Sequence, residues 1–124
     1  MGVKIAIGTD MLFDPSAAAK QDIMVTKLQN WFTPFEALRM VTSNNAELLT
    51  LSGPRHPYQE GPLGVIAEGA YADLFLVDGN PLEDLDLVGD AENNIVIMMR
   101  GGVIYKNALR EVAPARRAST CARR

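Results

Sequence analysis

A single short apolar segment stands before the helical part of this sequence, and it limits the folds open to the chain. The segment "KIAI", residues 4–7, ends at Gly8-Thr9-Asp10 and predicts a short buried strand. Further segments typical of strands come only after residue 64, beyond a stretch that predicts helices. A strand needs neighbours for its backbone N–H and C=O groups. We therefore expect this first strand to pair with elements that the 124 residues do not contain.

The clearest local signal is the start of a helix at residue 33. Thr33 is a favoured N-cap, Pro34 suits the first helical position, and Glu36 stands where a capping box places its acid. The two cap hydrogen bonds satisfy N–H groups that the first turn of a helix leaves free. The sequence therefore predicts a helix over residues 34–41.

Two more helices are expected on either side of this one. The first follows Asp14-Pro15-Ser16, and the other runs from a cap at Ser43 or Asn44 to Gly53. Apolar side chains at helical spacing indicate the faces that the three helices bury. These side chains are Ile23, Met24, Leu28, Trp31, Phe32, Phe35, Leu38, Met40, Val41, Ala46, Leu48, Leu49 and Leu51.

The part of the chain after residue 64 predicts antiparallel strands. Residues 95–99 and 103–105 flank Gly101-Gly102, and a two-glycine turn between apolar segments is typical of a hairpin. Another strand is expected over residues 72–77, with a shorter one at Val65-Ile66. The order of elements is thus strand, helices, then several strands.

Composition is typical of a folded protein. Hydrophobic residues make up 48% of the chain, enough to build a core. No apolar run approaches the ~20 residues that cross a bilayer, and the N-terminus lacks the pattern of a secretory signal. The one cysteine, Cys121, has no partner for a disulfide. We expect no membrane partner and a cytoplasmic location.

Charge is distributed unevenly along the chain, whose net charge is −3. Residues 108–124 contain five arginines and one acidic residue, Glu111. Residues 1–107 therefore carry a more negative net charge than the whole chain. A net negative charge on residues 1–107 does not favour nucleic-acid binding. The basic segment has almost nothing apolar to bury, which predicts a disordered tail.

Four motifs together resemble the C-terminal part of the amidohydrolase superfamily. They are "IAIGTD", "TPFEALRMVTSNNAELLTL", "GPLGVIAEGAYADLFLVDGNPLEDL" and "IVIMMRGGVIYKN", spread over residues 3–107. The "GTD" element alone is weak, the third motif followed by the glycine turn of the fourth is the most specific element, and the ordered series is a strong signal. The sequence is most similar to metal-dependent hydrolases of the imidazolonepropionase-like and Xaa-Pro-dipeptidase-like groups.

The resemblance implies an α/β fragment of a larger fold. In this family a distorted TIM barrel carries a small β-sandwich built from both chain ends. Residues 1–53 would then hold the last strand and the closing helices of the barrel, and residues 54–63 a linker loop. Residues 64–107 would supply the C-terminal strands of the sandwich, and residues 108–124 the disordered basic tail.

Asp10 is the one residue to which the resemblance assigns a role. It would lie at the C-terminal end of the last barrel strand, where TIM barrels keep their catalytic residues. The family's Asp at this position binds a divalent metal, expected to be zinc, and shuttles a proton. The reaction implied is hydrolysis of a C–N bond in a small amide, cyclic amide or dipeptide. Without the resemblance, the favoured interpretation of Asp10 is an Asp that caps the loop after a strand, which is a common use of Asp in turns.

The other ligands of such a metal site are missing from the sequence. The family uses several His side chains, and this chain has only His56, between prolines in "PRHPY". We interpret His56 as a surface loop residue. The carboxylates between residues 73 and 90 lack the order of a calcium loop and indicate a solvated acidic face, with a loop or single helical turn over 84–90. They are Asp73, Asp78, Glu83, Asp84, Asp86 and Asp90.

Two interpretations remain open. In the first, the chain is part of a hydrolase, inactive by itself and without a tightly bound metal. In the second, it is a non-catalytic truncated product that acts as an oligomerising structural module. Both predict a homo-oligomer, because exposed strand edges and unpartnered apolar faces favour association.

Overall fold

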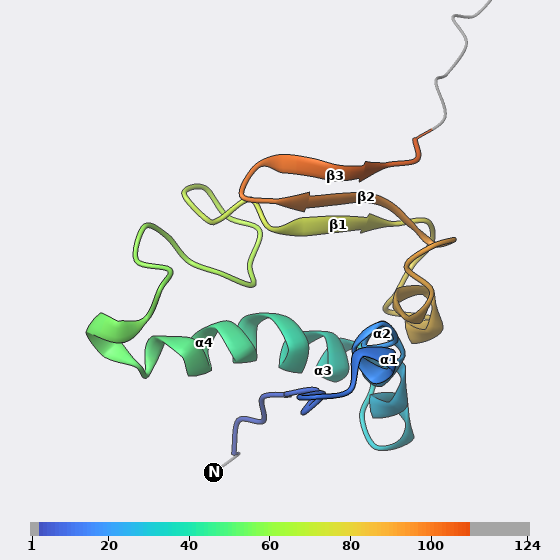
Figure 1. Ribbon diagram of the computed structural model, residues 1–124, viewed down its shortest axis with the longest axis horizontal. Coiled ribbons are helices and arrows are strands. Elements are labelled where there is room, and N and C mark those ends of the chain that lie inside the picture. Colours follow the sequence, from blue (N-terminus) through green and yellow to red (C-terminus); the bar gives the residue numbers. More distant parts are fainter. Residues whose placement is uncertain (1–2, 110–124) are drawn as a thin grey trace, which may run out of the picture.

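The computed structural model describes residues 3–109, in which a three-stranded antiparallel sheet lies over a layer of helices (Figure 1). The strand order is β1-β2-β3. The strands are β1 (Leu74–Val77), β2 (Ile95–Arg100) and β3 (Val103–Asn107). The predicted strands over 72–77, 95–99 and 103–105 are therefore confirmed, with small shifts at their ends. Most of the predicted tail, residues 110–124, lies outside the described part of the chain.

The hairpin between β2 and β3 turns through two glycines, as expected. Arg100 pairs with Val103, so the loop has two residues, Gly101 and Gly102, with φ of 54° and 78°. Positive φ at both central positions is the requirement of a tight turn whose twist matches the flanking strands. Glycine meets this requirement without a steric cost.

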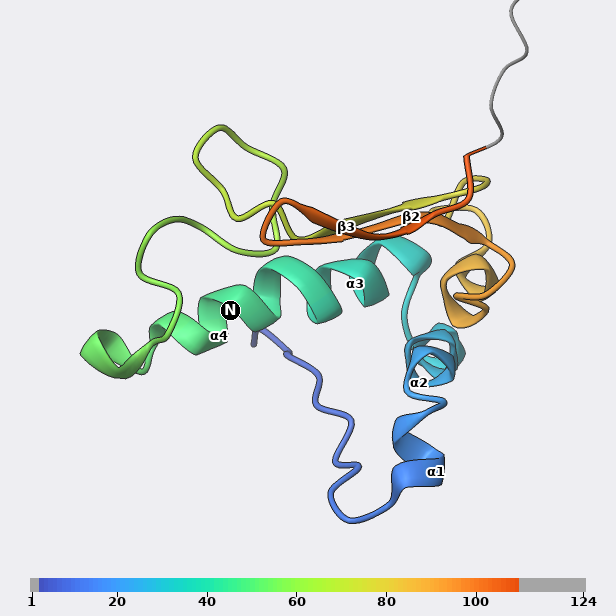
Figure 2. The same cartoon turned by 45° about the horizontal axis from the view of Figure 1, so that its top comes forward.

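The first helical stretch is divided rather than continuous. It consists of α1 (Pro15–Ala18), α2 (Asp22–Thr26) and a 3₁₀ turn, η1 (Lys27–Asn30). The predicted start is confirmed, since the Asp14 side chain caps α1. In Figure 2, α1 lies farther from the sheet than α2. Leu28 is the one buried residue of α1, α2 and η1.

The capping box at Thr33 is confirmed in both directions. The Thr33 hydroxyl accepts from the Glu36 backbone N–H at 3.3 Å, and the Glu36 carboxylate accepts from the Thr33 N–H at 2.9 Å. It opens α3 (Pro34–Arg39), which continues through a π-helical turn, η2 (Met40–Asn44), into α4 (Asn45–Thr50). The expected separate helix with its own cap near residue 44 is therefore wrong. Asn44 makes no cap hydrogen bond, because its side chain is used elsewhere.

The predicted strand over residues 4–7 does not form. Among residues 3–109, the sheet contains β1, β2 and β3 alone, and neither residues 4–7 nor Val65-Ile66 belong to it. A strand is defined by its ladder of hydrogen bonds to a neighbour, and the described residues offer residues 4–7 no such neighbour. Side chains of the long helix formed by α3, η2 and α4, residues 34–50, bind this segment instead.

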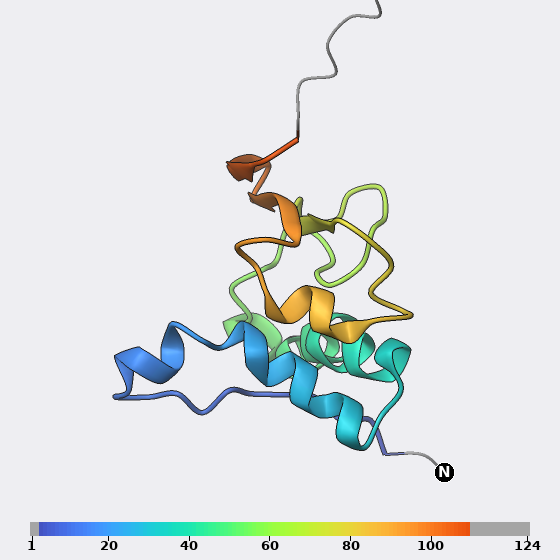
Figure 3. The same ribbon diagram turned by 90° about the vertical axis from the view of Figure 1, so that its right-hand side faces the viewer.

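A small core lies where α2, α3 and the end of the sheet meet. It is formed by Leu28, Ala37, Leu85 and Val88, with Val77 of β1 packed against them. Leu85 and Val88 belong to a 3₁₀ helix, η4 (Leu85–Gly89), which lies beside α2 (Figure 3). The single helical turn expected over residues 84–90 is thus confirmed, and it contributes to the core.

Several apolar side chains predicted to be buried are exposed. Trp31 is 74% and Leu51 is 79% exposed. The described residues provide no second layer on these sides of the helices, so their apolar faces have nothing to pack against. The other members of this group are Ile23, Phe35, Leu48 and Leu49. No helix in the part of the chain that the structure describes is long and apolar enough to cross a membrane.

Gly64 provides a test of how the loop after the helices packs. Its φ is +68°, and a Cβ there would lie 2.6 Å from the Thr42 carbonyl oxygen in η2. Gly69 has a similar φ of +79°, but open space surrounds it. We predict that Gly69→Ala lowers the free energy of unfolding by about 1–2 kcal/mol through backbone strain. Gly64→Ala should lower the free energy of unfolding by a further ~1–3 kcal/mol, because the backbone atoms of η2 that its Cβ would meet must move.

Urea unfolding of the two variants beside the parent chain measures both values. An equal decrease in the free energy of unfolding in the two variants would show that the loop does not approach η2 as described.

The capping box also predicts a pH dependence. The pKa of Glu36 lies below its ordinary value because its carboxylate accepts from the Thr33 N–H and hydroxyl. A carboxylate with a lowered folded pKa stabilises the fold above its unfolded pKa, and this contribution is lost as the pH falls. The stability difference between the parent and Glu36→Gln should therefore shrink from pH 6 to pH 3. Glu60→Gln is the matched control, and a difference for Glu36→Gln that stays constant with pH would contradict the prediction.

Candidate active-site segment

Asp10 lies in an exposed segment between residues 3–7 and α1. Its φ is +48°, in the left-handed region that few non-glycine residues adopt. Phe13, later in the same segment, has a φ of 69°. Asp tolerates this conformation better than most residues, and such outliers concentrate at functional sites. Asp10 thus combines an exposed side chain with an uncommon backbone conformation.

Asn45, the first residue of α4, binds the chain three residues before Asp10. The Ile7 N–H donates to Asn45 Oδ1 at 2.8 Å, and Asn45 Nδ2 donates to the Ile7 carbonyl at 2.9 Å. A flipped amide would place a donor against a donor, so this pair fixes the orientation of the carboxamide. Both backbone groups of Ile7 are satisfied without a neighbouring strand.

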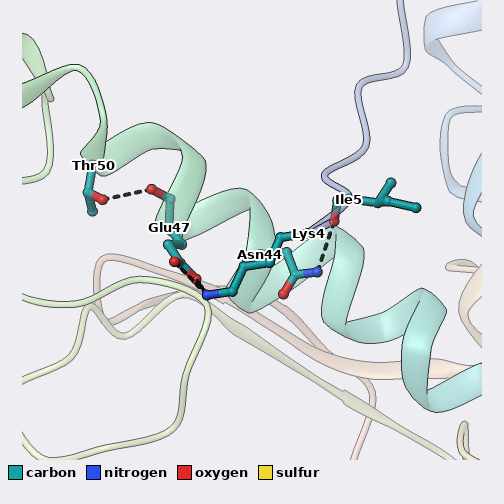
Figure 4. A network of polar contacts seen from close by, with 5 residues as sticks. All are labelled: Lys4, Ile5, Asn44, Glu47 and Thr50. Carbon is teal, nitrogen blue, oxygen red and sulfur yellow. Dashed lines mark hydrogen bonds and ion pairs between the residues drawn. The ribbon is translucent and has the colours of Figure 1, made fainter. Parts of the chain in front are cut away.

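A second set of contacts binds the same segment farther from Asp10 (Figure 4). Asn44 Nδ2 donates to the Ile5 carbonyl at 2.8 Å. The Lys4 ammonium contacts both carboxylate oxygens of Glu47, at 2.5 and 2.6 Å. Both side chains of this ion pair are more than half exposed, so it adds little stability. The helix therefore holds residues 4–7 mainly through its two asparagines.

The other end of the Asp10 segment is held by Asp14. Its side chain accepts from the backbone N–H groups of Ser16 and Ala17, each at 3.0 Å. The Ala17 N–H and the Ser16 hydroxyl hold the pKa of Asp14 below its ordinary range. Within residues 3–109, no hydrogen bond holds residues 8–13 between these two ends. Asp10 thus lies in a short unpaired segment between Ile7, which Asn45 binds, and the N-cap of α1.

His56 is not the plain surface residue that the sequence suggested. It is half-buried, and its ring lies 5.6 Å from that of Tyr58. Its Nδ1 atom is buried and finds no hydrogen-bond partner among the described residues. His56 and Tyr58 line a cleft of about 330 Å³ beside α4, and Asp10 does not line this cleft. The structure therefore does not bring His56 and Asp10 into one site.

The acidic residues between 73 and 90 bind local backbone and side-chain groups. The Asp73 carboxylate accepts from the Gly101 N–H at 2.6 Å, and Asp84 accepts from the Asp86 N–H at 3.0 Å. Asp90 accepts from the Asn93 side chain at 2.8 Å, which lowers the pKa of Asp90. Among residues 3–109, no three His, Cys, Asp or Glu side chains are grouped to hold a metal ion.

Comparison with known proteins decides the family. The amidohydrolase family profile matches residues 1–104, which include Asp10, the helices and most of the sheet. The chain belongs to the amidohydrolase family. The resemblance drawn from the four sequence motifs is therefore confirmed.

Among curated proteins, this amidohydrolase chain is similar to the ochratoxinase of Aspergillus niger. The two are 30% identical over 105 residues, which cover 85% of this chain and 20% of the ochratoxinase. The chain thus spans about a fifth of the length of the curated relatives it matches.

Crystal structures show the same partial match. An amidohydrolase superposes with a TM-score of 0.72 at 32% identity, over 88% of this chain and 24% of the other. A prolidase complexed with N-methylphosphonate-L-proline superposes with a TM-score of 0.68 at 35% identity, over 86% of this chain and 24% of the prolidase. The A. niger ochratoxinase superposes with a TM-score of 0.65 at 28% identity, over 86% of this chain and 22% of the ochratoxinase. The mixed helix-and-strand fold is therefore that of part of an amidohydrolase.

Proposed function

We propose that this chain forms the C-terminal part of a metal-dependent amidohydrolase that hydrolyses C–N bonds in small amides, cyclic amides or dipeptides. Residues 3–53 would close the barrel of that enzyme, and residues 64–107 would complete its sandwich. The chain by itself would be inactive. The substrate would be a small molecule, and the complete enzyme would use a divalent metal, with zinc as the expected ion.

The observation that carries this proposal is the similarity to the prolidase complex. A phosphonate joined to proline has a tetrahedral phosphorus, and attack of water on a carbonyl carbon passes through a similar geometry. The prolidase shares 35% identity with this chain over 86% of its length. This supports C–N bond hydrolysis, and it favours a dipeptide among the three substrate classes.

The residues described here do not by themselves fit a metal ion. A hydrolytic metal site needs about three protein ligands and an open position. Asp10 offers one carboxylate, and His56 lies in a separate cleft. The remaining ligands would therefore come from parts of the enzyme outside this chain.

Asp10 is the residue to which we assign catalysis. Its carboxylate would be a ligand of the metal and a proton shuttle, which accepts the proton of the attacking water and returns it to the leaving nitrogen. Its exposure and its left-handed backbone support this role, because an Asp that only capped a loop would accept local hydrogen bonds. Asp14, four residues later, is such a cap.

A chimeric enzyme tests this role. Residues 3–107 would replace the matching fifth of the A. niger ochratoxinase, and hydrolysis of an N-acyl amino acid and of a proline dipeptide would be measured with zinc. We predict that Asp10→Asn lowers kcat by about 10²–10⁴-fold.

Asp14→Asn is the matched control and should change kcat by less than about tenfold. Thermal unfolding and gel filtration would establish that each variant folds. A folded Asp10→Asn chimera with unchanged kcat would contradict the proposal.

A second candidate function is an oligomerising structural module. The exposed apolar side chains of the helices favour it, since Leu51 and Trp31 expose about three-quarters of their surface. In this case the chain would associate through these faces and would have no catalytic role.

Light scattering on the chain as it elutes from gel filtration, with a zinc assay on the same elution peak, addresses both candidates. We predict an oligomer without stoichiometric zinc, because association covers the apolar faces and one carboxylate holds zinc weakly. Leu51→Glu should weaken association more than its charge-matched neighbour Ser52→Glu. Retained hydrolytic activity in a monomer with bound zinc would contradict the view that the chain is incomplete.

A further inference from the structure

We propose that Asn45 is a positioning residue for Asp10, and that its carboxamide sets the point from which the catalytic segment leaves the helix layer. This inference rests on the proposed role of Asp10. It adds that the position of the carboxylate depends on a side chain 35 residues later in the sequence, at the first turn of α4.

The contact has the form of a strand pair made by one side chain. In an antiparallel sheet, two opposite residues exchange an N–H···O=C bond in each direction. Asn45 reproduces this exchange with Ile7, at 2.8 and 2.9 Å. Both bonds are partly buried, so water competes with them less than with a surface contact. One carboxamide thereby fixes both the place and the direction of the backbone at Ile7.

The helix that carries Asn45 is itself well anchored. The capping box at Thr33 fixes its start, and the fully buried Ala37 attaches it to the core. Ala46, the residue after Asn45, is also buried. A side chain on such an element holds its partner more precisely than one on a loop.

The segment beyond Ile7 has little else to hold it. Gly8 has open space where a side chain would stand, and residues 8–13 make no hydrogen bonds within the described part of the chain. The left-handed turn at Asp10 follows two residues after Gly8. Among the contacts of the described residues, the last fixed backbone point before Asp10 is therefore Ile7. A misplacement of about 1 Å there is enough to lower a catalytic rate.

Asn44 offers a matched control on the same helix. It binds the same segment through a single exposed bond to the Ile5 carbonyl, two residues farther from Asp10. Removal of either asparagine takes away a similar side chain, yet only Asn45 fixes Ile7. The two variants therefore separate a positioning role from general loss of helix contacts.

The first test uses the 124-residue chain and amide hydrogen exchange measured by NMR. In Asn45→Ala, exchange of the Ile7 N–H should accelerate at least tenfold, and the Asp10 amide should show a lower order parameter. Asn45→Asp keeps the acceptor for the Ile7 N–H, so it should restore part of the protection. Asn44→Ala should leave the Ile7 N–H unchanged. Equal exchange at Ile7 in the parent and Asn45→Ala would overturn the proposal.

The second test uses the chimeric enzyme. Asn45→Ala should lower kcat by about tenfold with KM nearly unchanged, whereas Asn44→Ala should affect kcat by less than about twofold. If Asp10→Asn abolishes activity while Asn45→Ala and Asn44→Ala behave alike, the positioning role is wrong and the proposed function stands. If Asp10→Asn retains full activity, the proposed function fails first.

Discussion

The two hydrogen bonds between Asn45 and the backbone of Ile7 hold the N-terminal segment in this structure. The segment has a strand-like sequence but no strand beside it in the described chain, so its polar backbone groups need other partners. The long helix supplies them through Asn44 and Asn45. This arrangement also explains why the helix does not begin anew at residue 44, since that side chain is turned toward the segment rather than toward its own helix.

The apolar side chains of the described residues are divided between a small core and the solvent. Among residues 3–109, seven apolar residues are buried, while Trp31 and Leu51 lie largely in solvent. The chain matches about a fifth to a quarter of its relatives' length, so most of the length of those proteins has no counterpart in this chain. The described residues thus have a small core and large exposed apolar faces. They favour association with other protein surfaces.

The candidate site combines a fixed boundary with an unpaired middle. Asn45 holds the chain before Asp10, and the Asp14 cap holds it after. The carboxylate between them is exposed on a left-handed backbone. Such an arrangement is compatible with the proposed role, in which Asp10 would be one ligand of a metal ion whose other ligands come from another part of an enzyme.

The sequence by itself determined the features that depend on residues close together in the chain. The capping box at Thr33, the two-glycine hairpin and the membership of the amidohydrolase family were all predictable, because each rests on local chemistry or on an ordered set of motifs. Tertiary structure alone decided the rest. The strand over residues 4–7 failed because its partner is absent, and His56 became half-buried because Tyr58 packs on it. The contact of Asn45 could not be predicted from the sequence, because it spans 38 residues and no local pattern encodes a hydrogen bond to a distant backbone.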